Sequence, residues 1–501
     1  MCCKQLRACV SVVLWAAIVS ASVSAADPPP ILANWHVDDD FTGKADGTVL
    51  RPFRTVQQAI AAAQDSDVIA VAAGTYSQNI SVREKAVKLY GGFVGGTAES
   101  YARGEAGDFK TRDPAANVSH LKGNGKDSVV TLFEAGATIV DGFRVSGGGR
   151  SQVAAPSWLG GGFYIYAGSP TLANNVIEDN HTCPRKVQDE EKLGGGIYAT
   201  GAKIAILDNL IRNNTAGRGA GVAADCPRIV LKGNTVQGNV GVSDHGGGLY
   251  LFSNDATISY NQILENEIGR ALGYGWGGGV IVFNKGGSYK FSHNVFTGNF
   301  APSVGSALFV DDGAVASLEN DLIFANACNP AGNGAVPAVY VDGSDAGPGS
   351  TLKINHTTIA DHVCKPTVPG NAINVTGKSQ VIITNSILWN NGGDDVEADA
   401  TSKFTASYTL AQEKLKGTGN LSADPLFVDA SKRDYRLRSL TGRWDAAASN
   451  RQGAWVRDAQ QSPAIDAADP KVPFDREPEP HGGRANLGAD GNTPQAGKSR
   501  E

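Results

Sequence analysis

The sequence predicts an all-β fold, a right-handed parallel β-helix, and three observations lead to that prediction. A motif of the form Asn-x-apolar-x-x-Asn recurs from Asn175 to Asn390, and successive copies begin 25 to 36 residues apart. A glycine-rich strand start follows each loop, as in Gly-Gly-Gly-Ile-Tyr at 194–198. Apolar residues in these starts alternate with a period of two, which favours strands over helices. One such coil cannot bury its apolar face alone, so about eight coils must stack between residues 160 and 400.

Composition agrees with a repetitive β protein. The 501 residues include 62 glycines, and charged residues make up only 19% while hydrophobic residues make up 41%. These values disfavour both helical bundles and a disordered chain. The formal net charge of −6 argues against a nucleic-acid partner, because no basic stripe is present to contact phosphates.

Residues 1–26 read as a signal peptide. Lys4 and Arg7 form a basic start, an apolar run follows, and Val23-Ser24-Ala25 is a small-residue cleavage site. No other segment is apolar enough to span a membrane. We therefore expect a secreted protein that is extracellular or on the cell surface, with the periplasm as an alternative, and we expect it to be a monomer.

The mature chain divides into three parts. Residues 27–145 are expected to form an N-terminal cap with the first coils, residues 146–410 the β-helix repeats, and residues 411–501 a mostly irregular closing segment. Within the cap, Phe53, Val56 and Ile60 follow helical spacing, and Pro52 suits a first helical turn. This predicts an amphipathic capping helix over the otherwise open apolar end of the coils.

The recurring asparagines are predicted to be structural. Equivalent turns in neighbouring coils lie about 4.8 Å apart, so their side-chain amides can bond from coil to coil in continuous ladders. The glycines are expected at the corners between loop and strand, where positive φ or close chain approach is needed.

Two parts of the sequence resemble known families. Phe53-x-Thr55-Val56-x-x-Ala59-Ile60 and Val71-x-x-Gly74-Thr75-Tyr76 resemble the entry segment of pectin-lyase-like right-handed β-helix proteins, and the repeats resemble the same superfamily and, distantly, polymorphic outer-membrane proteins. Residues 462–470 and 483–489 resemble the closing region of bacterial secreted β-helix repeat proteins. The resemblance implies the fold. It implies no single activity, because the superfamily includes lyases, hydrolases, epimerases and adhesins.

Parity along the first strand of each coil separates inward from outward residues. Two aliphatic columns are predicted to face the core, and the first of them is Phe163, Ile197, Val222, Leu249, Val280, Leu308, Val339 and Ile373. The first outward column is then Tyr164, Tyr198, Ala223, Tyr250, Ile281, Phe309, Tyr340 and Asn374. The second outward column is Tyr166, Thr200, Asp225, Phe252, Phe283, Asp311, Asp342 and Thr376.

The outward aromatic residues allow three interpretations: rings that stack on one another for stability, a platform for sugar rings, or a surface for a protein partner. Long loops enter the same sheet and are expected to wall a groove beside it. On the second interpretation, the residues predicted to bind substrate are Tyr164, Tyr198, Tyr250, Phe252, Phe283, Phe309, Tyr340, Trp158 and Trp276.

Catalytic residues are predicted from chemistry and position. Asp311 and Asp342 occupy one column in adjacent coils, so their backbones should lie about 4.8 Å apart. Such a carboxylate pair can serve glycoside hydrolysis, can bind Ca²⁺, or can be two solvated turn residues. A lyase needs a base and a cation instead, for which His245 and Arg270 are candidates by location.

One disulfide is predicted, between Cys328 and Cys364. Each cysteine lies two residues after the same ladder position in consecutive coils, Asn326 and His362, within the separation a disulfide needs. Cys183 and Cys226 show no such match and are expected to be free.

The leading functional hypothesis is a secreted protein that binds or degrades polysaccharide, lyase-like or glycosidase-like, in a groove on the outer face of one parallel sheet. The alternative is a non-catalytic surface or adhesion protein that uses the β-helix as a stalk.

Overall fold

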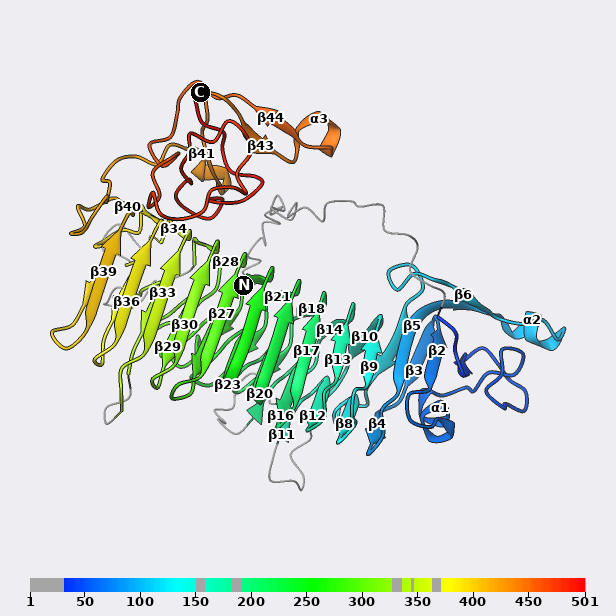
Figure 1. Ribbon diagram of the computed structural model, residues 1–501. Coiled ribbons are helices and arrows are strands. Elements are labelled where there is room, and N and C mark those ends of the chain that lie inside the picture. The colour runs from blue at the N-terminus through cyan, green and yellow to red at the C-terminus, as the bar shows by residue number, and fades with distance from the viewer. Residues whose placement is uncertain are drawn as a thin grey trace, which may run out of the picture.

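The chain winds into a long solenoid of parallel strands in the computed structural model (Figure 1). The structure describes residues 31–149, 158–182, 192–326, 336–343, 347–362 and 371–500. Each coil contributes strands to three ladders, which we call the first, second and third ladders in chain order within a coil. The first and second ladders merge into one sheet because β20 (Val222–Lys232) and β23 (Leu249–Ser259) run through both. The predicted all-β solenoid is confirmed.

The first ladder carries the columns on which the functional prediction rests. Besides β20 and β23 it consists of β4 (Ile80–Arg83), β8 (Val130–Phe133), β12 (Phe163–Tyr166), β16 (Ile197–Thr200), β26 (Val280–Phe283), β29 (Leu308–Asp311), β32 (Val339–Val341), β35 (Ile373–Val375) and β38 (Val396–Ala398).

The second ladder follows the first after a turn. It consists of β1 (Trp35–Val37), β2 (Val68–Ala72), β5 (Lys88–Gly95), β9 (Ile139–Asp141), β13 (Thr171–Ala173), β17 (Lys203–Leu207), β27 (Ser288–Ser292), β30 (Val315–Glu319), β33 (Thr351–Asn355), β36 (Gln380–Thr384) and β39 (Lys403–Ser407) with β20 and β23; β6 (Asp108–Arg112) adds to β5 antiparallel.

The third ladder is a separate sheet. It runs through β3 (Gly74–Ser77), β7 (Ser119–Lys122), β10 (Phe143–Ser146), β14 (Val176–Glu178), β18 (Leu210–Arg212), β21 (Thr235–Gln237), β24 (Gln262–Leu264), β28 (Val295–Thr297), β31 (Leu322–Phe324), β34 (Thr358–Ala360), β37 (Ile387–Trp389) and β40 (Leu410–Ala411).

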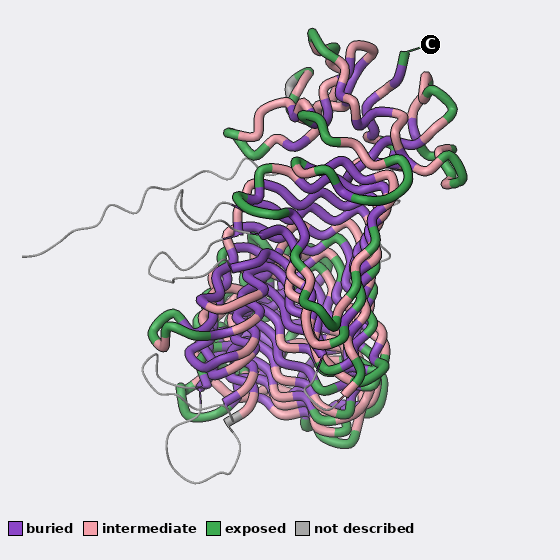
Figure 2. Tube along the Cα trace, turned by 90° about the vertical axis from the view of Figure 1, so that its left-hand side faces the viewer, coloured by how far each residue is buried: buried purple, intermediate pink, exposed green. Residues whose placement is uncertain are grey.

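The predicted register is confirmed. Phe163 pairs with Ile197, Ile197 with Val222, and the series continues to Ile373. Every residue of the two inward columns is at most 2% exposed. The buried residues therefore form a continuous core along the solenoid, drawn in purple in Figure 2. Tyr198 and Tyr250 are not part of that core. A shift by one residue would have placed tyrosines in that core.

The N-terminal cap contains the expected helix in a shorter form. Helix α1 (Val56–Ala62) begins after the cap residue Thr55, whose side chain accepts a hydrogen bond from Gln58 N while Gln58 bonds back to Thr55. Its residues Val56, Ala59 and Ile60 are buried in the main core. Pro52 lies before the helix and not in its first turn, because the capping box sets the start at Val56. A second short helix is α2 (Ala98–Ala102).

Two asparagine ladders run along the third-ladder turns, as predicted. In one, the side-chain oxygen of Asn239 accepts bonds from Asn214 N and Nδ2, each 3.0 Å. Asn239 Nδ2 donates in turn to Asn266 Oδ1 at 2.9 Å, and Asn266 and Asn299 repeat the pattern. The side chain of Asn239 is fully buried. The ladder amides therefore supply the hydrogen bonds that buried polar groups of the neighbouring coil need.

The closing segment packs on the outer face of the third ladder. Its regular elements are β41 (Phe427–Asp429), η1 (Ala430–Lys432), β42 (Asp434–Leu437), β43 (Arg443–Asp445), α3 (Ala448–Arg451) and β44 (Ala454–Val456). Tyr435, Leu437 and Leu487 join a second buried cluster with Leu322 and Ile387, which point outward from β31 and β37. This segment lies over the last coils in Figure 1. Apolar outward residues at these coils explain why it docks there.

The predictions about the cysteines and the signal peptide are tested only in part. Cys226 is free and buried, as expected. The signal peptide and Cys183, Cys328 and Cys364 lie outside the described residues, so the disulfide stays a prediction. Within the described part of the chain, none of the helices has the length and apolar character needed to cross a bilayer.

Candidate functional site

The second outward column presents aromatic rings to solvent in two groups. Tyr166 and Phe252 are 40% and 37% exposed, which is unusually high for large apolar side chains in this molecule. Tyr166 stacks on Phe133 of the preceding coil, with ring centroids 4.8 Å apart and an interplanar angle of 15°. Phe252 meets Phe283 of the next coil edge to face at 5.3 Å. Thr200 and Asp225 separate the two groups.

The first outward column is more covered than predicted. Tyr164 and Tyr198 stack at 6.0 Å and are partly buried, and Tyr250 lies 4.7 Å from Phe283. Phe309 is only 4% exposed and packs on Tyr340 at 5.2 Å. A covered ring cannot stack on a sugar, so Phe309 does not fit its predicted binding role in this structure. Ala223 and Ile281, in the same column, are 1% exposed.

Loops folding back over the sheet cause this coverage. Before each first-ladder strand from β12 to β29, a glycine with positive φ lies at the corner three residues ahead of the strand, and Gly246 with φ 68° is one of them. A Cβ on Gly246 would lie 2.8 Å from Leu249 O, so only glycine lets the loop turn this tightly. The loops pair with one another beside the first ladder, as His245 does with Trp276 and Trp276 with Val304. Further pairs are β11 (Trp158–Leu159) with β15 (Lys192–Leu193), and β19 (Thr215–Ala216) with β22 (Val240–Gly241) and β25 (Glu267–Ile268).

A charged cluster on these loops surrounds His245. The Arg218 guanidinium binds the Asp244 carboxylate with Nε to Oδ1 at 2.6 Å and Nη2 to Oδ2 at 2.8 Å. His245 Nδ1 lies 3.0 Å from Asp244 Oδ1, an ion-pair contact that lacks hydrogen-bond geometry. Burial acts to raise the pKa of Asp244, but His245 and Arg218 outweigh it and hold that pKa well below its usual range. Asp244 is therefore ionised, binds the Arg218 guanidinium through both oxygens and has the His245 imidazole beside it.

Aromatic rings complete the surroundings of His245. Its imidazole lies 4.9 Å from the Trp276 ring and 6.4 Å, edge on, from Tyr250. Arg218 lies over the same Tyr250 ring at 6.0 Å. The structure thus brings the predicted residues His245, Trp276 and Tyr250 together on one flank of the first ladder.

Arg270 and Trp158 have other partners. Arg270 Nε pairs with Glu267 at 2.7 Å, and its guanidinium stacks over the Phe300 ring at 3.8 Å. These partners hold Arg270 at the three-stranded β19–β22–β25 sheet, and no contact joins it to His245 among the described interactions. Trp158 pairs through its backbone with Lys192.

Asp311 and Asp342 lie side by side, as the register predicted. Their strands pair up to Val310 and Val341, and Asp342 N donates to Val310 O at 2.9 Å. Burial, assisted by the charges of Asp312 and Asp342, raises the pKa of Asp311 to about 6. His245 works against this shift, which places its charge within reach of Asp311.

Asp342 has a different environment. Its Oδ1 accepts hydrogen bonds from Thr376 Oγ1 and Gly343 N, each 2.8 Å. Thr376 Oγ1 also lies 2.8 Å from the Tyr340 hydroxyl, which links the carboxylate to the first outward column. The two carboxyl groups therefore differ: burial raises the pKa of Asp311, whereas Asp342 is oriented by two hydrogen bonds to one of its oxygens.

The predicted metal site at this pair is not completed by other ligands of the same kind. Among the described residues, no three His, Cys, Asp or Glu side chains form a group that could hold a metal ion. Ca²⁺ binding at Asp311 and Asp342 remains a prediction.

Four contributors were missed by the sequence analysis. Phe133 stacks in the second outward column, and Arg83 lies over its ring at 5.1 Å. The alternation Val130-Thr131-Leu132-Phe133 repeats that of Phe163 to Tyr166, so the repeat begins one coil earlier than assumed and Phe133 could have been found. Arg218 and Asp244 gave no such signal, because their pairing depends on how two loops fold.

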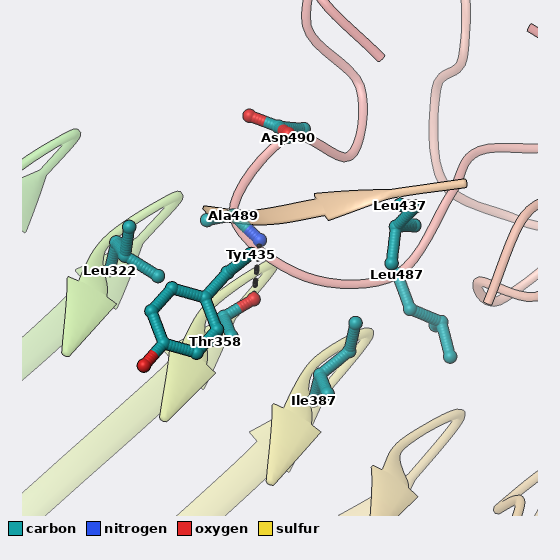
Figure 3. Close-up of a pocket in the computed structure, with 8 residues that line it drawn as sticks. All are labelled: Leu322, Thr358, Ile387, Tyr435, Leu437, Leu487, Ala489 and Asp490. Carbon is teal, nitrogen blue, oxygen red and sulfur yellow. Dashed lines mark hydrogen bonds between the residues drawn. The ribbon is translucent and has the colours of Figure 1, made fainter. Parts of the chain in front are cut away.

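A described hollow lies elsewhere in the molecule. It is lined by Leu322, Thr358, Ile387, Tyr435, Leu437, Leu487, Ala489 and Asp490, between the third ladder and the closing segment (Figure 3). Its mostly apolar lining marks it as a packing gap at that interface. Two of the loops predicted to wall a groove beside the first ladder, residues 147–160 and 181–193, lie largely outside the described part of the chain, so the groove stays a prediction.

Comparison with known proteins gives the fold. A family model described as right handed beta helix region matches residues 157–323. The chain has a right-handed parallel β-helix fold. Within this β-helix protein, a second model, described as disaggregatase related, matches residues 404–468 across the last coil and the start of the closing segment. A search among curated proteins gave no match.

Solved structures of similar shape are distant. Pectate lyase Pel9A is 12% identical with a TM-score of 0.39, covering 91% of this β-helix chain and 96% of that chain. XylC in complex with xylose is 12% identical with a TM-score of 0.36, covering 76% of each chain. GH136 lacto-N-biosidase from Eubacterium ramulus is 11% identical with a TM-score of 0.29, covering 75% of this chain and 67% of that chain.

Proposed function

We propose that this β-helix binds a polysaccharide along the outer face of its first ladder and hydrolyses it at Asp311 and Asp342. The observation that carries the proposal is the exposed aromatic pairs of the second outward column, which lead coil by coil to that carboxyl pair. Sugar rings present C–H faces that pack on aromatic rings, and a linear chain laid along the solenoid axis would cross one coil after another.

The carboxyl pair has the features that hydrolysis requires. Asp311 keeps its proton to a higher pH than an ordinary carboxyl and so suits the general acid that protonates the leaving oxygen. Asp342, whose Oδ1 accepts hydrogen bonds from Thr376 and Gly343, is oriented to serve as the nucleophile or base. Their strands are about 4.8 Å apart, a backbone spacing that lets two side-chain carboxyl groups reach the roughly 5–5.5 Å separation of retaining glycosidases.

The experiment is an incubation of the purified protein with a panel of uronate-containing and neutral polysaccharides. New reducing ends without absorbance of an unsaturated product indicate hydrolysis, and Asp311→Asn should abolish them while binding persists. Absorbance of the unsaturated product would instead indicate a lyase and would contradict the roles of Asp311 and Asp342. Binding without cleavage would favour the adhesion alternative.

Secretion belongs to the same proposal. A polysaccharide-degrading protein of this kind meets its substrate outside the cytoplasm, which fits the signal peptide expected at residues 1–26.

A further inference from the structure

Three buried oxygen atoms without hydrogen-bond donors lie in the closing segment, far along the chain from the first-ladder site. They are Asp466 Oδ1, Glu477 Oε2 and Asn492 Oδ1. Glu477 is only 5% exposed, so water does not reach its carboxylate freely. Buried acceptors nearly always have a partner, because leaving one unpaired costs about 1–3 kcal/mol. Three unpaired acceptors in one short segment therefore point to a ligand.

Hydrogen bonds gather the three residues around Asn486, which is fully buried. The other oxygen of Glu477, Oε1, accepts from the backbone N of Asn486 at 2.8 Å and of Asn492 at 2.7 Å. Asn486 Oδ1 in turn accepts from Asp466 N at 2.8 Å. Asp466 and Glu477 thus each bond directly to Asn486, and Asn492 bonds to Glu477.

We propose that Asp466, Glu477 and Asn492 bind a Ca²⁺ ion through these three oxygen atoms. The donors are two carboxylates and an amide carbonyl, which is the hard oxygen set that Ca²⁺ takes and that softer metals do not prefer. The amide is essential to the set, since no three acidic, His or Cys side chains group together in the described part of the chain. Backbone carbonyls and water would complete the coordination.

The ion would act as a structural clamp. Described residues 457–500 contain no helix or strand, yet they cover the outer face of the third ladder. The three donors come from separate stretches of this irregular chain, so one ion ties those stretches together and its binding free energy adds to folding.

Equilibrium dialysis of the full chain against Ca²⁺, after removal of bound metal with a chelator, tests the proposal. We expect one Ca²⁺ at this site in each chain with a dissociation constant at or below about 1 mM, the weak end for extracellular modules, and a higher melting temperature with Ca²⁺ than with chelator. Glu477→Gln and Asn492→Ala should each weaken binding at least tenfold and remove most of that melting shift. Circular dichroism checks that each variant folds, and the second variant keeps the test decisive if Glu477→Gln does not fold.

The control is the double variant Asp311→Asn with Asp342→Asn, which should still bind one ion. This control also separates the proposal from the hydrolytic function, which the same double variant abolishes. No binding at about 5 mM Ca²⁺, well above that range, would overturn the proposal. So would an ion that is lost from the double variant but retained by both closing-segment variants.

Discussion

Asp311 shows how burial can assign a chemical role to one residue of a matched pair. Its pKa of about 6 means that the general acid is protonated below pH 6 and loses its proton as pH rises through that value. We expect kcat/KM to fall about tenfold for each pH unit above 6. A profile of kcat/KM from pH 4 to pH 9, on the best substrate of the panel, measures this alkaline limb of the pH dependence. A rate that is flat from pH 6 to 9 would contradict the assignment of Asp311 as the acid.

His245 provides a second prediction at the residue scale. Its charge lowers the pKa of Asp311, so removing that charge should let Asp311 keep its proton to higher pH. In His245→Gln the alkaline limb of the pH profile should therefore move upward by a few tenths of a pH unit. The matched control is His293→Gln, a histidine that stacks on Tyr260 and not on the loop flank. If both variants leave the limb unmoved, His245 acts only in packing.

Asparagine ladders explain stability at the scale of the element. Asn239→Ala removes the acceptor for Asn214 and the donor to Ile211 O and leaves these buried groups unpaired. We expect a loss of about 3 kcal/mol in the free energy of unfolding. Asn254→Ala is the control, because Asn254 is exposed and accepts a single bond from Asn284, so its loss should stay under about 1 kcal/mol. Urea unfolding of both variants compares them, and equal losses would refute a special role for the ladder.

Asp321 interrupts one of these ladders with an acid. It accepts hydrogen bonds from Asn294 N and Nδ2, and burial raises its pKa to about 7. The unfolded chain releases this proton near pH 4 and the folded chain only near pH 7, so its contribution to stability is full below pH 4 and is lost as pH rises to 7. Asp321→Asn should make the decline in stability between pH 4 and pH 7 shallower. Thermal unfolding across that range checks it, and an unchanged slope would count against it.

Strand parity and repeat spacing were enough to predict the columns of the first ladder, because a period of two and a buried face leave only one register. They could not predict which outward residues are exposed. Phe309 and Ile281 have the same parity as Tyr164, yet loops cover them, and loop paths follow from long-range packing and not from local pattern. The Arg218–Asp244 pair depends on such loop paths too. Phe133, by contrast, could have been predicted from the repeat pattern.

At the scale of the whole molecule, the β-helix is a rigid support on which one face differs from the others. The third ladder is covered by the closing segment over its last coils, and the first ladder carries the partly exposed rings of Tyr166 and Phe252. A solenoid places equivalent side chains about 4.8 Å apart over many coils, which suits a long, regular ligand better than a compact one. The central claim is that this ligand is a polysaccharide held by Tyr166 and Phe252.

Affinity electrophoresis through gels that contain each polysaccharide of the panel tests that claim most directly. Asp311→Asn serves as the background, so that binding is measured without cleavage. In that background we expect retardation by at least one polysaccharide, and Tyr166→Ala with Phe252→Ala should reduce the affinity about tenfold or more. Tyr260→Ala, which removes an equally exposed ring at 38% from the corner after β23, should leave retardation unchanged. Retardation that survives the loss of Tyr166 and Phe252, or that is weakened as much by the loss of Tyr260, would contradict the account.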